Sequence, residues 1–276
     1  YHIELLAQVQ IPESASSIWG YTDSNSHEYA LLGTSEGVRI YSLLDPTNPL
    51  LLKFIPCTAS IWRELKTAGD FAYIVSESGD GLLIIDMNSL EHAFVKTCFN
   101  AAGDSIQLSA SHTLYIDDKN YIYLAGSAGV GGFIILDPNQ NPMQPEWIVS
   151  ERFEYMHEVH VYRDTLYAAA IYNGIFSIWD LKDRKNPKRI GEHESSGHFT
   201  HSVWIEKDRP ILYTTDETSG AAVEAWDVSD PTYIRKTDEF KIGGDQSRFL
   251  VPHNVFHKGD KLYVAYYSEG VRILDT

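Results

Sequence analysis

The feature that most constrains the fold is a segment that occurs six times: an apolar strand, an aspartate and a polar turn, as in FSIWDLKDRKNP (Phe176 to Pro187). A period of 40 to 50 residues with several strands in each unit is typical of the blades of a β-propeller. We interpret the shared aspartates as turn-forming residues that cap a strand end. They recur at intervals of 41 to 51 residues, at Asp45, Asp86, Asp137, Asp180, Asp227 and Asp275.

The segments between these aspartates have the composition of β-strands. They are rich in β-branched and aromatic residues and are bounded by Asn, Asp, Gly and Pro. In each repeat two strands, such as HSVWIEK and ILYTTDE, precede the strand with the aspartate, and an outer strand follows it. The repeats therefore predict an all-β chain and a single domain over residues 1–276, although the length alone would allow two domains.

The two ends of the chain complement each other. The last repeat stops at Thr276, where its outer strand would begin, while Glu4 to Pro12 (ELLAQVQIP) resembles the outer strand PLLLKFIP of the first repeat. The N-terminal strand is therefore expected to complete the last blade and to leave no open sheet edge at the junction. The sequence predicts a six-bladed β-propeller whose last blade is closed by the N-terminal strand.

Charge and apolar pattern exclude two classes of function. The chain has 22 Lys and Arg against 38 Asp and Glu, a formal net charge of −16. Because a nucleic-acid interface needs clustered positive charge, we exclude nucleic acid as a partner. The sequence has no run of about 18 apolar residues, so it predicts no transmembrane segment. Cys57 and Cys98 occupy similar places in neighbouring repeats, which leaves open one disulfide or two thiols.

The start of the chain bears on its location. It begins at Tyr1, with neither a methionine nor a charged-then-apolar leader. We interpret it as a mature form whose signal peptide has been removed. The expected location is extracellular, at the cell surface or periplasmic.

Three long segments carry a resemblance to a known family: SIWGYTDSNSHEYALLG (Ser17 to Gly33), IVSESGDGLLIID (Ile74 to Asp86) and PHNVFHKGDKLYVAYYSEGVRILD (Pro252 to Asp275). Along essentially its whole length the sequence resembles the LVIVD-repeat family of secreted bacterial proteins, in particular its choice-of-anchor B group. The resemblance implies a propeller of six or seven blades outside the cytoplasm. It implies little about activity, because one fold carries many functions.

Aligning the starts of the six first strands places a histidine or a tryptophan at one position in every repeat: Trp19, Trp62, His112, His157, His201 and His253. The first strand of a blade lies nearest the axis, so these side chains are expected to form a ring at one height of the central channel. His160 falls three residues after His157, so we expect it on the opposite strand face, in a seam or at the surface.

Four imidazoles that converge on an axis are ligands for Zn, Cu, Fe, Ni or Mn. The sequence thus predicts a divalent metal ion held by the four histidines, with the two tryptophans lining a ligand site. The competing interpretation is structural, with each histidine hydrogen-bonded to the backbone of the neighbouring blade. The sequence leaves both interpretations open.

Acidic residues are expected at the same end of the channel. In a four-stranded antiparallel blade, the start of the first strand and the loop between the second and third strands lie at one end. Those loops contain Glu77, Asp80, Asp216, Glu217 and Glu269. Such a rim, with Asp216 and Glu217 as ligand-binding candidates, would suit Ca²⁺ or would attract cationic substrates. Solvated loop acids are the alternative.

Three other residues are candidates for catalysis. Arg63 and Glu64 follow Trp62, where the arginine would bind a carboxylate or sulfate and the glutamate would act as a base. Tyr155, two residues before His157, would serve as an acid or a stacking wall. A buried Arg63–Glu64 pair that only holds the blade is the competing interpretation.

Two hypotheses of function follow. In the first, a secreted or surface-exposed propeller is a binding or scaffold module whose mouth contacts an extracellular protein, a glycan or a small molecule. In the second, it is a metal-dependent lyase, hydrolase or oxidase that acts on a sugar or small organic substrate at the four-histidine site. The sequence has no G-x-S-x-G elbow, phosphate-binding glycine loop, H-E-x-x-H motif or EF-hand spacing, which favours the first hypothesis.

Overall fold

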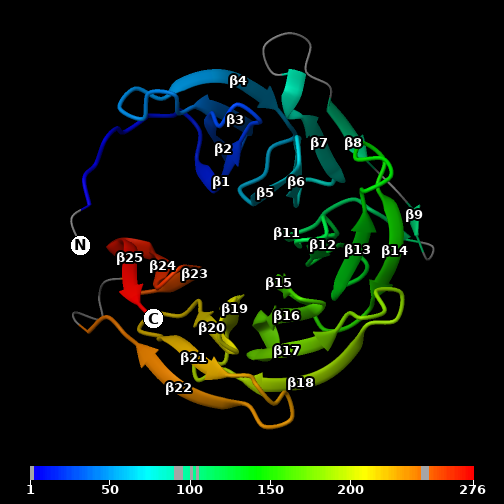
Figure 1. Ribbon diagram of the computed structural model, residues 1–276, viewed down its shortest axis with the longest axis vertical. Helices are drawn as coiled ribbons and strands as arrows, with labels where there is room; N and C mark the ends of the chain where they lie inside the picture. The colour runs from blue at the N-terminus through cyan, green and yellow to red at the C-terminus, as the bar shows by residue number, and fades with distance from the viewer. Residues whose placement is uncertain (1–2, 90–95, 100–101, 104–105, 244–248) are drawn as a thin grey trace.

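The computed structural model is a six-bladed β-propeller, as predicted (Figure 1). It describes residues 3–89, 96–99, 102–103, 106–243 and 249–276. Apart from strands, these residues form three 3₁₀ turns, Met87–Ser89, Ile171–Asn173 and Tyr267–Glu269. Within this part of the chain, no helix has the length and apolar character that a membrane crossing requires.

Each blade is an antiparallel sheet whose strands follow one another in sequence from the axis outwards. Blade 1 contains β1 (Ala15–Thr22), β2 (Glu28–Thr34), β3 (Gly37–Ser42) and β4 (Leu50–Pro56). Blade 2 contains β5 (Arg63–Ala68), β6 (Phe71–Ser76), β7 (Leu82–Asp86) and β8 (Lys96–Phe99). Blade 3 contains β11 (Thr113–Ile116), β12 (Ile122–Ala125), β13 (Phe133–Asp137) and β14 (Glu146–Glu151).

The second half of the ring repeats this order. Blade 4 contains β15 (Glu158–Tyr162), β16 (Thr165–Ala170), β17 (Ile175–Asp180) and β18 (Lys188–Glu194). Blade 5 contains β19 (Thr200–Ile205), β20 (Ile211–Asp216), β21 (Val223–Asp227) and β22 (Arg235–Phe240). Blade 6 contains three strands, β23 (Pro252–Lys258), β24 (Lys261–Tyr266) and β25 (Gly270–Asp275). A two-stranded ladder of β9 (Ala102–Gly103) and β10 (Ile106–Gln107) lies between blades 2 and 3 in the sequence.

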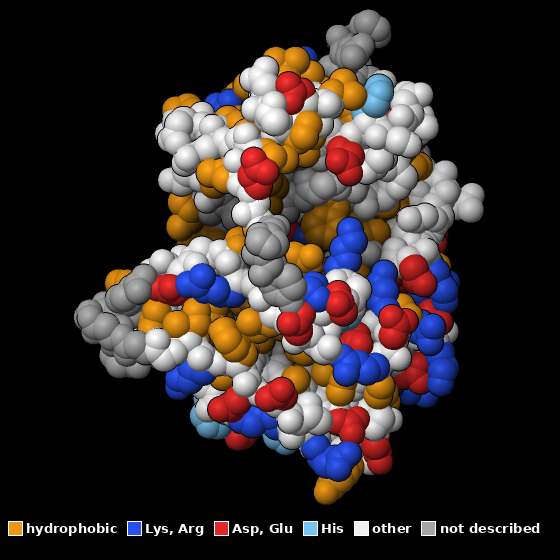
Figure 2. All heavy atoms as spheres, turned by 60° about the vertical axis from the view of Figure 1, so that its left-hand side comes forward, with side chains coloured by type: hydrophobic (Ala, Val, Ile, Leu, Met, Phe, Trp, Pro, Cys, Tyr) orange, Lys and Arg blue, Asp and Glu red, His pale blue; other side chains and the backbone are white. Residues whose placement is uncertain are grey.

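Five hydrophobic clusters fill five of the six seams between blades. In the first, Ile40 of blade 1 packs with Leu65 of blade 2, and in the fifth, Tyr213 of blade 5 packs with Leu262 of blade 6. None of the five clusters, which are drawn from the described residues, joins blade 6 to blade 1. In Figure 1 β1 faces blade 6 across a wide gap, and Figure 2, turned towards that side, shows the surface hollowed between two lobes. We call this place the open seam.

The N-terminal segment differs from its predicted role. Residues 3–14 carry no strand, and β25 is the outermost strand of blade 6 among the described residues. The apolar side chains of the segment stay in solvent, with Ile3 71% and Leu5 79% exposed. Because blade 6 has no packed neighbour on the side of the open seam, a fourth strand there would bury little apolar surface.

Four of the six shared aspartates cap strand ends, as interpreted from the sequence. The Asp180 carboxylate accepts a hydrogen bond from the backbone N–H of Lys182 at 2.8 Å, and the corresponding aspartates of blades 2, 3 and 5 accept the same bond. Blade 1 departs from the alignment, because Ser42 pairs with Leu50 as Asp180 pairs with Lys188. Ser42 therefore holds the equivalent position, and Asp45 caps the next turn through Thr47.

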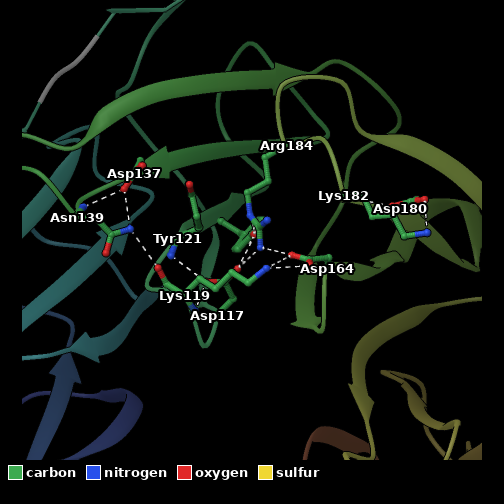
Figure 3. Close-up of polar contacts among 10 residues, drawn as sticks. Asp117, Lys119, Tyr121, Asp137, Asn139, Asp164, Asp180, Lys182 and Arg184 are labelled. Atoms are coloured by element: carbon green, nitrogen blue, oxygen red, sulfur yellow. Dashed lines mark hydrogen bonds and ion pairs between the residues drawn. The ribbon is translucent and has the colours of Figure 1, made fainter.

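A polar network joins blades 3 and 4 at the face opposite the starts of the first strands (Figure 3). Arg184, from the loop after β17, donates a hydrogen bond to the buried carboxylate of Asp117 at 2.8 Å and lies 2.8 Å from a carboxylate oxygen of Asp164. Lys119 also donates to Asp164, at 2.7 Å. This network fixes the turns of two neighbouring blades relative to each other.

Whether Cys57 and Cys98 form a disulfide or two thiols stays a prediction. The Cys57 thiol lies 3.6 Å from the carbonyl oxygen of Ile55, and the side chain of Cys98 falls outside the described residues.

Candidate functional site: a three-tiered central channel

The six innermost strands place their side chains in three tiers along the channel. We define the tiers by strand register. The starting point is one residue on the first strand of each blade, chosen because it pairs with the same position of the second strand in all six blades. These residues form the aromatic tier: Trp19, Lys66, Tyr115, His160, Trp204 and Phe256. Two residues earlier on each strand lies the polar tier: Ser17, Glu64, Thr113, Glu158, Ser202 and Asn254. One residue earlier again lie Ser16, Arg63 and the histidine tier: His112, His157, His201 and His253.

Irregular pairing turns two of the four histidines, His201 and His253, towards the axis. Adjacent residues of a regular strand point to opposite faces, so a histidine next to a residue of the polar tier would normally face a seam. The pairing of β19 with β20 shifts between Thr200 and Ser202, and that of β23 with β24 shifts between Pro252 and Val255. Such bulges re-aim side chains, and each of these two contains a histidine of the tier.

The four imidazoles of the histidine tier form one stacked arc. Ring centroids of consecutive histidines lie 4.1 Å apart from His112 to His157, from His157 to His201 and from His201 to His253. Burial, together with the nearby His112, lowers the pKa of His157 to about 3. Burial and the neighbouring imidazoles hold the pKa of His201 well below its ordinary value. These two rings are therefore neutral at physiological pH, the state in which imidazole binds metals.

Glu217 completes a potential metal site beside the arc. Its carboxylate oxygens lie 3.7 Å from Nε2 of His201 and 3.5 Å from Nε2 of His253. One ligand atom from each of the three residues lies within 4.8 Å of the other two. Ligand atoms bound at 2.0–2.2 Å to a tetrahedral ion are about 3.4 Å apart, so the spacing matches a transition-metal site. The hydroxyl of Tyr267 donates a short hydrogen bond to Glu217.

Aromatic residues surround the other end of the arc. Trp62 is half exposed, and its ring centroid lies 6.2 Å from that of His112. Nδ1 of His112 lies 2.6 Å from a carboxylate oxygen of Glu77. Tyr155 contacts the His157 ring at 6.4 Å between centroids, and burial raises the pKa of its hydroxyl. Trp62 thus lies beside His112 and Tyr155 beside His157.

The polar tier contains a carboxyl group without a cationic partner among the described residues. Glu158 accepts hydrogen bonds from the hydroxyl of Ser202 at 3.0 Å and from the amide of Asn254 at 2.8 Å. Burial, reinforced by the charge of Glu64, raises the pKa of Glu158 to about 8. Glu64 itself forms a short ion pair with the ammonium group of Lys66.

The aromatic tier is a second stacked arc. The ring centroids lie 4.4 Å apart between Tyr115 and His160, 4.2 Å between His160 and Trp204, and 5.0 Å between Trp204 and Phe256. Lys66 closes the tier on the other side, with Nζ 4.5 Å from the centroid of the Trp19 ring. Both ring nitrogens of His160 are buried without a hydrogen-bond partner, and burial lowers the pKa of this residue to about 3.

A cavity of about 410 Å³ runs through the three tiers. It reaches from His201 and Glu217 at the mouth, past Glu158, to Trp204 and Phe256. Its wall also includes Ser16 to Ile18 of β1 and Ala265 of β24, which flank the open seam. Cavities of this size hold small molecules.

Three predicted site residues lie elsewhere than expected. Trp19 belongs to the aromatic tier, because it pairs with Leu31 as Lys66 pairs with Tyr73. The guanidinium of Arg63 turns into the seam between blades 1 and 2, where it donates to the carbonyl oxygens of Thr34 at 3.0 Å and Thr58 at 2.7 Å. It holds two backbone segments together, and the predicted pairing with Glu64 is absent because Glu64 binds Lys66.

Asp216 also has a different environment from the predicted rim. Its buried carboxylate accepts hydrogen bonds from the backbone N–H groups of Gly197 at 2.9 Å and Phe199 at 2.8 Å. The acids near the mouth therefore do not gather into one oxygen cluster of the kind that Ca²⁺ requires. Within the described residues, the single group of metal-ligand type is His201, Glu217 and His253.

The two lower tiers were not predicted from the sequence. His160 was expected in a seam or at the surface, but it stacks within the aromatic tier, because His157 precedes β15 and does not follow the alternation of that strand. Glu158 lies next to His157 and is the first residue of β15. The signal that could have revealed both is the alternation of residues from Glu158 to Tyr162, which places Glu158 and His160 on one face.

Comparisons with known proteins bear on the fold. No protein-family model and no curated protein matches the sequence. A hypothetical selenium-binding protein from Sulfolobus tokodaii has a TM-score of 0.71 at 16% identity, over 99% of this chain and 80% of that one. A 6-phosphogluconolactonase candidate from Bacteroides uniformis has a TM-score of 0.69 at 12% identity, over 96% of this chain and 83% of that one.

A longer protein gives a similar match. The dihydro-heme d1 dehydrogenase NirN, solved in complex with DHE, has a TM-score of 0.63 at 12% identity, over 95% of this chain. The match covers 54% of that protein, so this chain spans about half of its length. At such low identity the likeness concerns the fold alone, and these comparisons place the chain among proteins with a β-propeller fold.

Proposed function

We propose that this protein is a binding module that holds one divalent transition-metal ion at the mouth of its channel and takes up a small molecule in the cavity below. His201, His253 and Glu217 are the proposed ligands, and His157, stacked on His201, is the nearest candidate for a fourth. The observation that carries the proposal is the approach of three ligand atoms within 4.8 Å of one another. Two imidazoles and one carboxylate suit zinc and its neighbours in the first transition series better than Ca²⁺.

The wider setting of this proposal follows from the repeats. We propose that residues 1–276 form one domain of the LVIVD-repeat type, located outside the cytoplasm. The resemblance in the first two blades and in the last supports the family and the location. Hydrophobic clusters that each span two neighbouring blades support a single cooperative unit.

Metal content tests the proposed function directly. Protein purified without a tag and loaded with Zn²⁺ or Co²⁺ should hold about one equivalent of metal, as measured by mass spectrometry. Bound Co²⁺ should give the visible absorption that is typical of a low coordination number. His201→Ala and Glu217→Gln should each lower the affinity by about tenfold or more. His27→Ala, an exposed histidine in blade 1, should leave it unchanged. A wild-type protein that takes up less than about a tenth of an equivalent after metal addition would refute the metal site.

Metal-dependent catalysis is the second candidate. It is favoured by the raised pKa of Glu158, because a carboxyl group that keeps its proton near neutral pH suits acid–base chemistry. The reaction would be of the lyase, hydrolase or oxidase class on a sugar or small organic substrate, as the sequence suggested. Turnover of panels of such substrates by the metal-loaded protein, lost in Glu158→Gln with metal content intact, would support it.

A further inference from the structure

The channel below the histidine tier has the size and lining of a site for a small molecule. The cavity of about 410 Å³ is bounded by charged and hydrogen-bonding groups of the polar tier and by rings of the aromatic tier. An occupant with complementary charge and apolar groups would satisfy both kinds of lining group. The lining therefore indicates the chemistry of the occupant.

The charges in the polar tier leave one group unmatched. Lys66 interacts with Glu158 electrostatically, but its ammonium group is already paired with Glu64 and donates to the carbonyl oxygen of Leu65. The two hydrogen bonds to Glu158 come from Ser202 and Asn254, which are neutral. No ion pair reaches Glu158 from any described residue. A positive charge in the cavity would favour the ionised form of this carboxyl group and give it the partner that it lacks.

The aromatic tier supplies the complementary surface. Tyr115, Trp204 and Phe256 line the cavity, and the π-faces of such rings attract organic cations at about 4 to 6 Å. Lys66 already shows the same contact within the tier, with Nζ 4.5 Å from the Trp19 centroid. A ligand cation on the other side of the channel would repeat that arrangement against the remaining rings.

The approach to the cavity favours the same charge. The net charge of −16 and the carboxylates of Glu77 and Glu217 near the mouth raise the local concentration of cations. The cavity wall also includes Ser17 and Ile18 of blade 1 and Ala265 of blade 6, on the two sides of the open seam.

We propose that the cavity binds a small organic ammonium ion, with its charge against Glu158 and its alkyl groups against Tyr115, Trp204 and Phe256. This inference deepens the proposed function by naming the class of small molecule, and it rests on that function for the use of the channel as a binding site. It requires no metal, because Glu158 and the aromatic tier lie below the proposed metal ligands.

Titration calorimetry with choline and with 3,3-dimethyl-1-butanol, its neutral carbon isostere, tests the inference on wild-type protein. In protein stripped of metal with EDTA, choline should bind about tenfold more tightly than the alcohol. Equal affinities would show that the cavity selects shape or polarity rather than positive charge, and would overturn the inference. So would a lack of saturable binding up to about 20 mM choline.

Variants place the ligand in the cavity. Glu158→Gln should weaken choline binding about tenfold and Trp204→Leu should weaken it severalfold, while Glu158→Asp, which keeps the charge, should retain part of the affinity. Glu192→Gln, at an exposed site on β18, is the matched control and should bind as the wild type does. Unchanged choline affinity in folded Glu158→Gln would overturn the inference.

The two proposals fail in different ways. If the metal site is absent, choline binding should persist without any metal and in His201→Ala. If the ammonium site is absent, metal uptake by wild-type protein should be unaffected, and choline should bind no better than its isostere.

Discussion

A carboxylate oxygen of Glu217 lies 3.7 Å from Nε2 of His201, an imidazole that is buried and held neutral at physiological pH. A neutral imidazole forms no salt bridge, so the approach of these groups is not explained by charge attraction. The same carboxylate lies 3.5 Å from Nε2 of His253. Two imidazole nitrogens that face one carboxylate at these distances leave room for an ion between them.

Removal of the Tyr267 hydroxyl should weaken this site. That hydroxyl donates to Glu217 and fixes the carboxylate in place, and groups that orient a metal ligand typically contribute 10- to 100-fold to affinity. Tyr267→Phe should therefore lower metal affinity by about tenfold, measured by competition with a chelating indicator. Tyr233→Phe, at an exposed site in blade 5, is the control. An affinity within about twofold of wild type would contradict this role.

Glu206 should make the stability of blade 5 depend on acid pH. Burial would raise the pKa of Glu206, but hydrogen bonds from Arg209 and Tyr213 outweigh it and hold the pKa below its ordinary value of 4.5. An acid with a lowered pKa stabilises the native state above 4.5, and that contribution is lost as the pH falls through the folded-state pKa.

Glu206→Gln should accordingly melt at a lower temperature than wild type at pH 7, with the difference shrinking below pH 4.5. Thermal melts by circular dichroism between pH 7 and pH 3 measure it. Glu146→Gln, on the exposed side of β14, is the matched amide replacement. A difference that grows as the pH falls would refute the assignment.

A comparison of Gly174 with Gly259 distinguishes the cost of backbone strain from the cost of a steric clash. Gly174 and Gly259 both have φ of +66°, where a side chain is strained. A Cβ at Gly174 would lie 2.6 Å from the backbone of His198, whereas one at Gly259 would meet nothing within 4 Å. Gly259→Ala should cost about 1 kcal/mol of unfolding free energy and Gly174→Ala about 3 kcal/mol, measured by urea denaturation. Equal losses of unfolding free energy in the two variants would mean that the loop around His198 shifts to accommodate the added Cβ without cost.

The junction of blades 3 and 4 should depend on Asp117. Its carboxylate is buried and accepts bonds from Arg184 and Tyr123, so Asp117→Asn leaves a partly buried guanidinium with a weaker partner. The expected loss is about 3 to 5 kcal/mol. Asp164→Asn, which affects a more exposed partner of the same arginine, should cost about 1 kcal/mol or less. Chemical denaturation of both variants checks the order, and the reverse order would contradict it.

The N-terminal segment should be dispensable for stability as far as Glu13. Because the apolar side chains of this segment are exposed, deletion of residues 1–11 should move the melting temperature by less than about 2 °C. Glu13→Gln should lower it more, because Glu13 makes two hydrogen bonds with Arg39, at 3.0 and 2.6 Å. A large drop on deletion would show that the segment does add a strand to blade 6.

Much of the fold was predictable because each sequence repeat corresponds to one blade. The alternation of strand and turn residues within each repeat identified the strands, and the repeat number gave the six blades. In blade 1 the sequence alignment was wrong by three residues at two places. Ser42 holds the position assigned to Asp45, and Trp19 lies three residues beyond the histidine tier, because the repeats were aligned by residue type rather than by hydrogen-bond register. Arg63 could not be placed from sequence either, since its partners Thr34 and Thr58 lie across a seam.

The sequence by itself determined the propeller and the presence of four histidines near the start of four first strands. Period and composition suffice for that, because each blade must bury its faces against its neighbours. Only the tertiary structure decided what those histidines face. Bulges turned His201 and His253 to the axis beside Glu217, and the regular alternation of β15 placed Glu158 and His160 beneath them. The ring of blades brings together residues that lie about 45 positions apart in the sequence, and no local sequence pattern encodes the distances between their side chains.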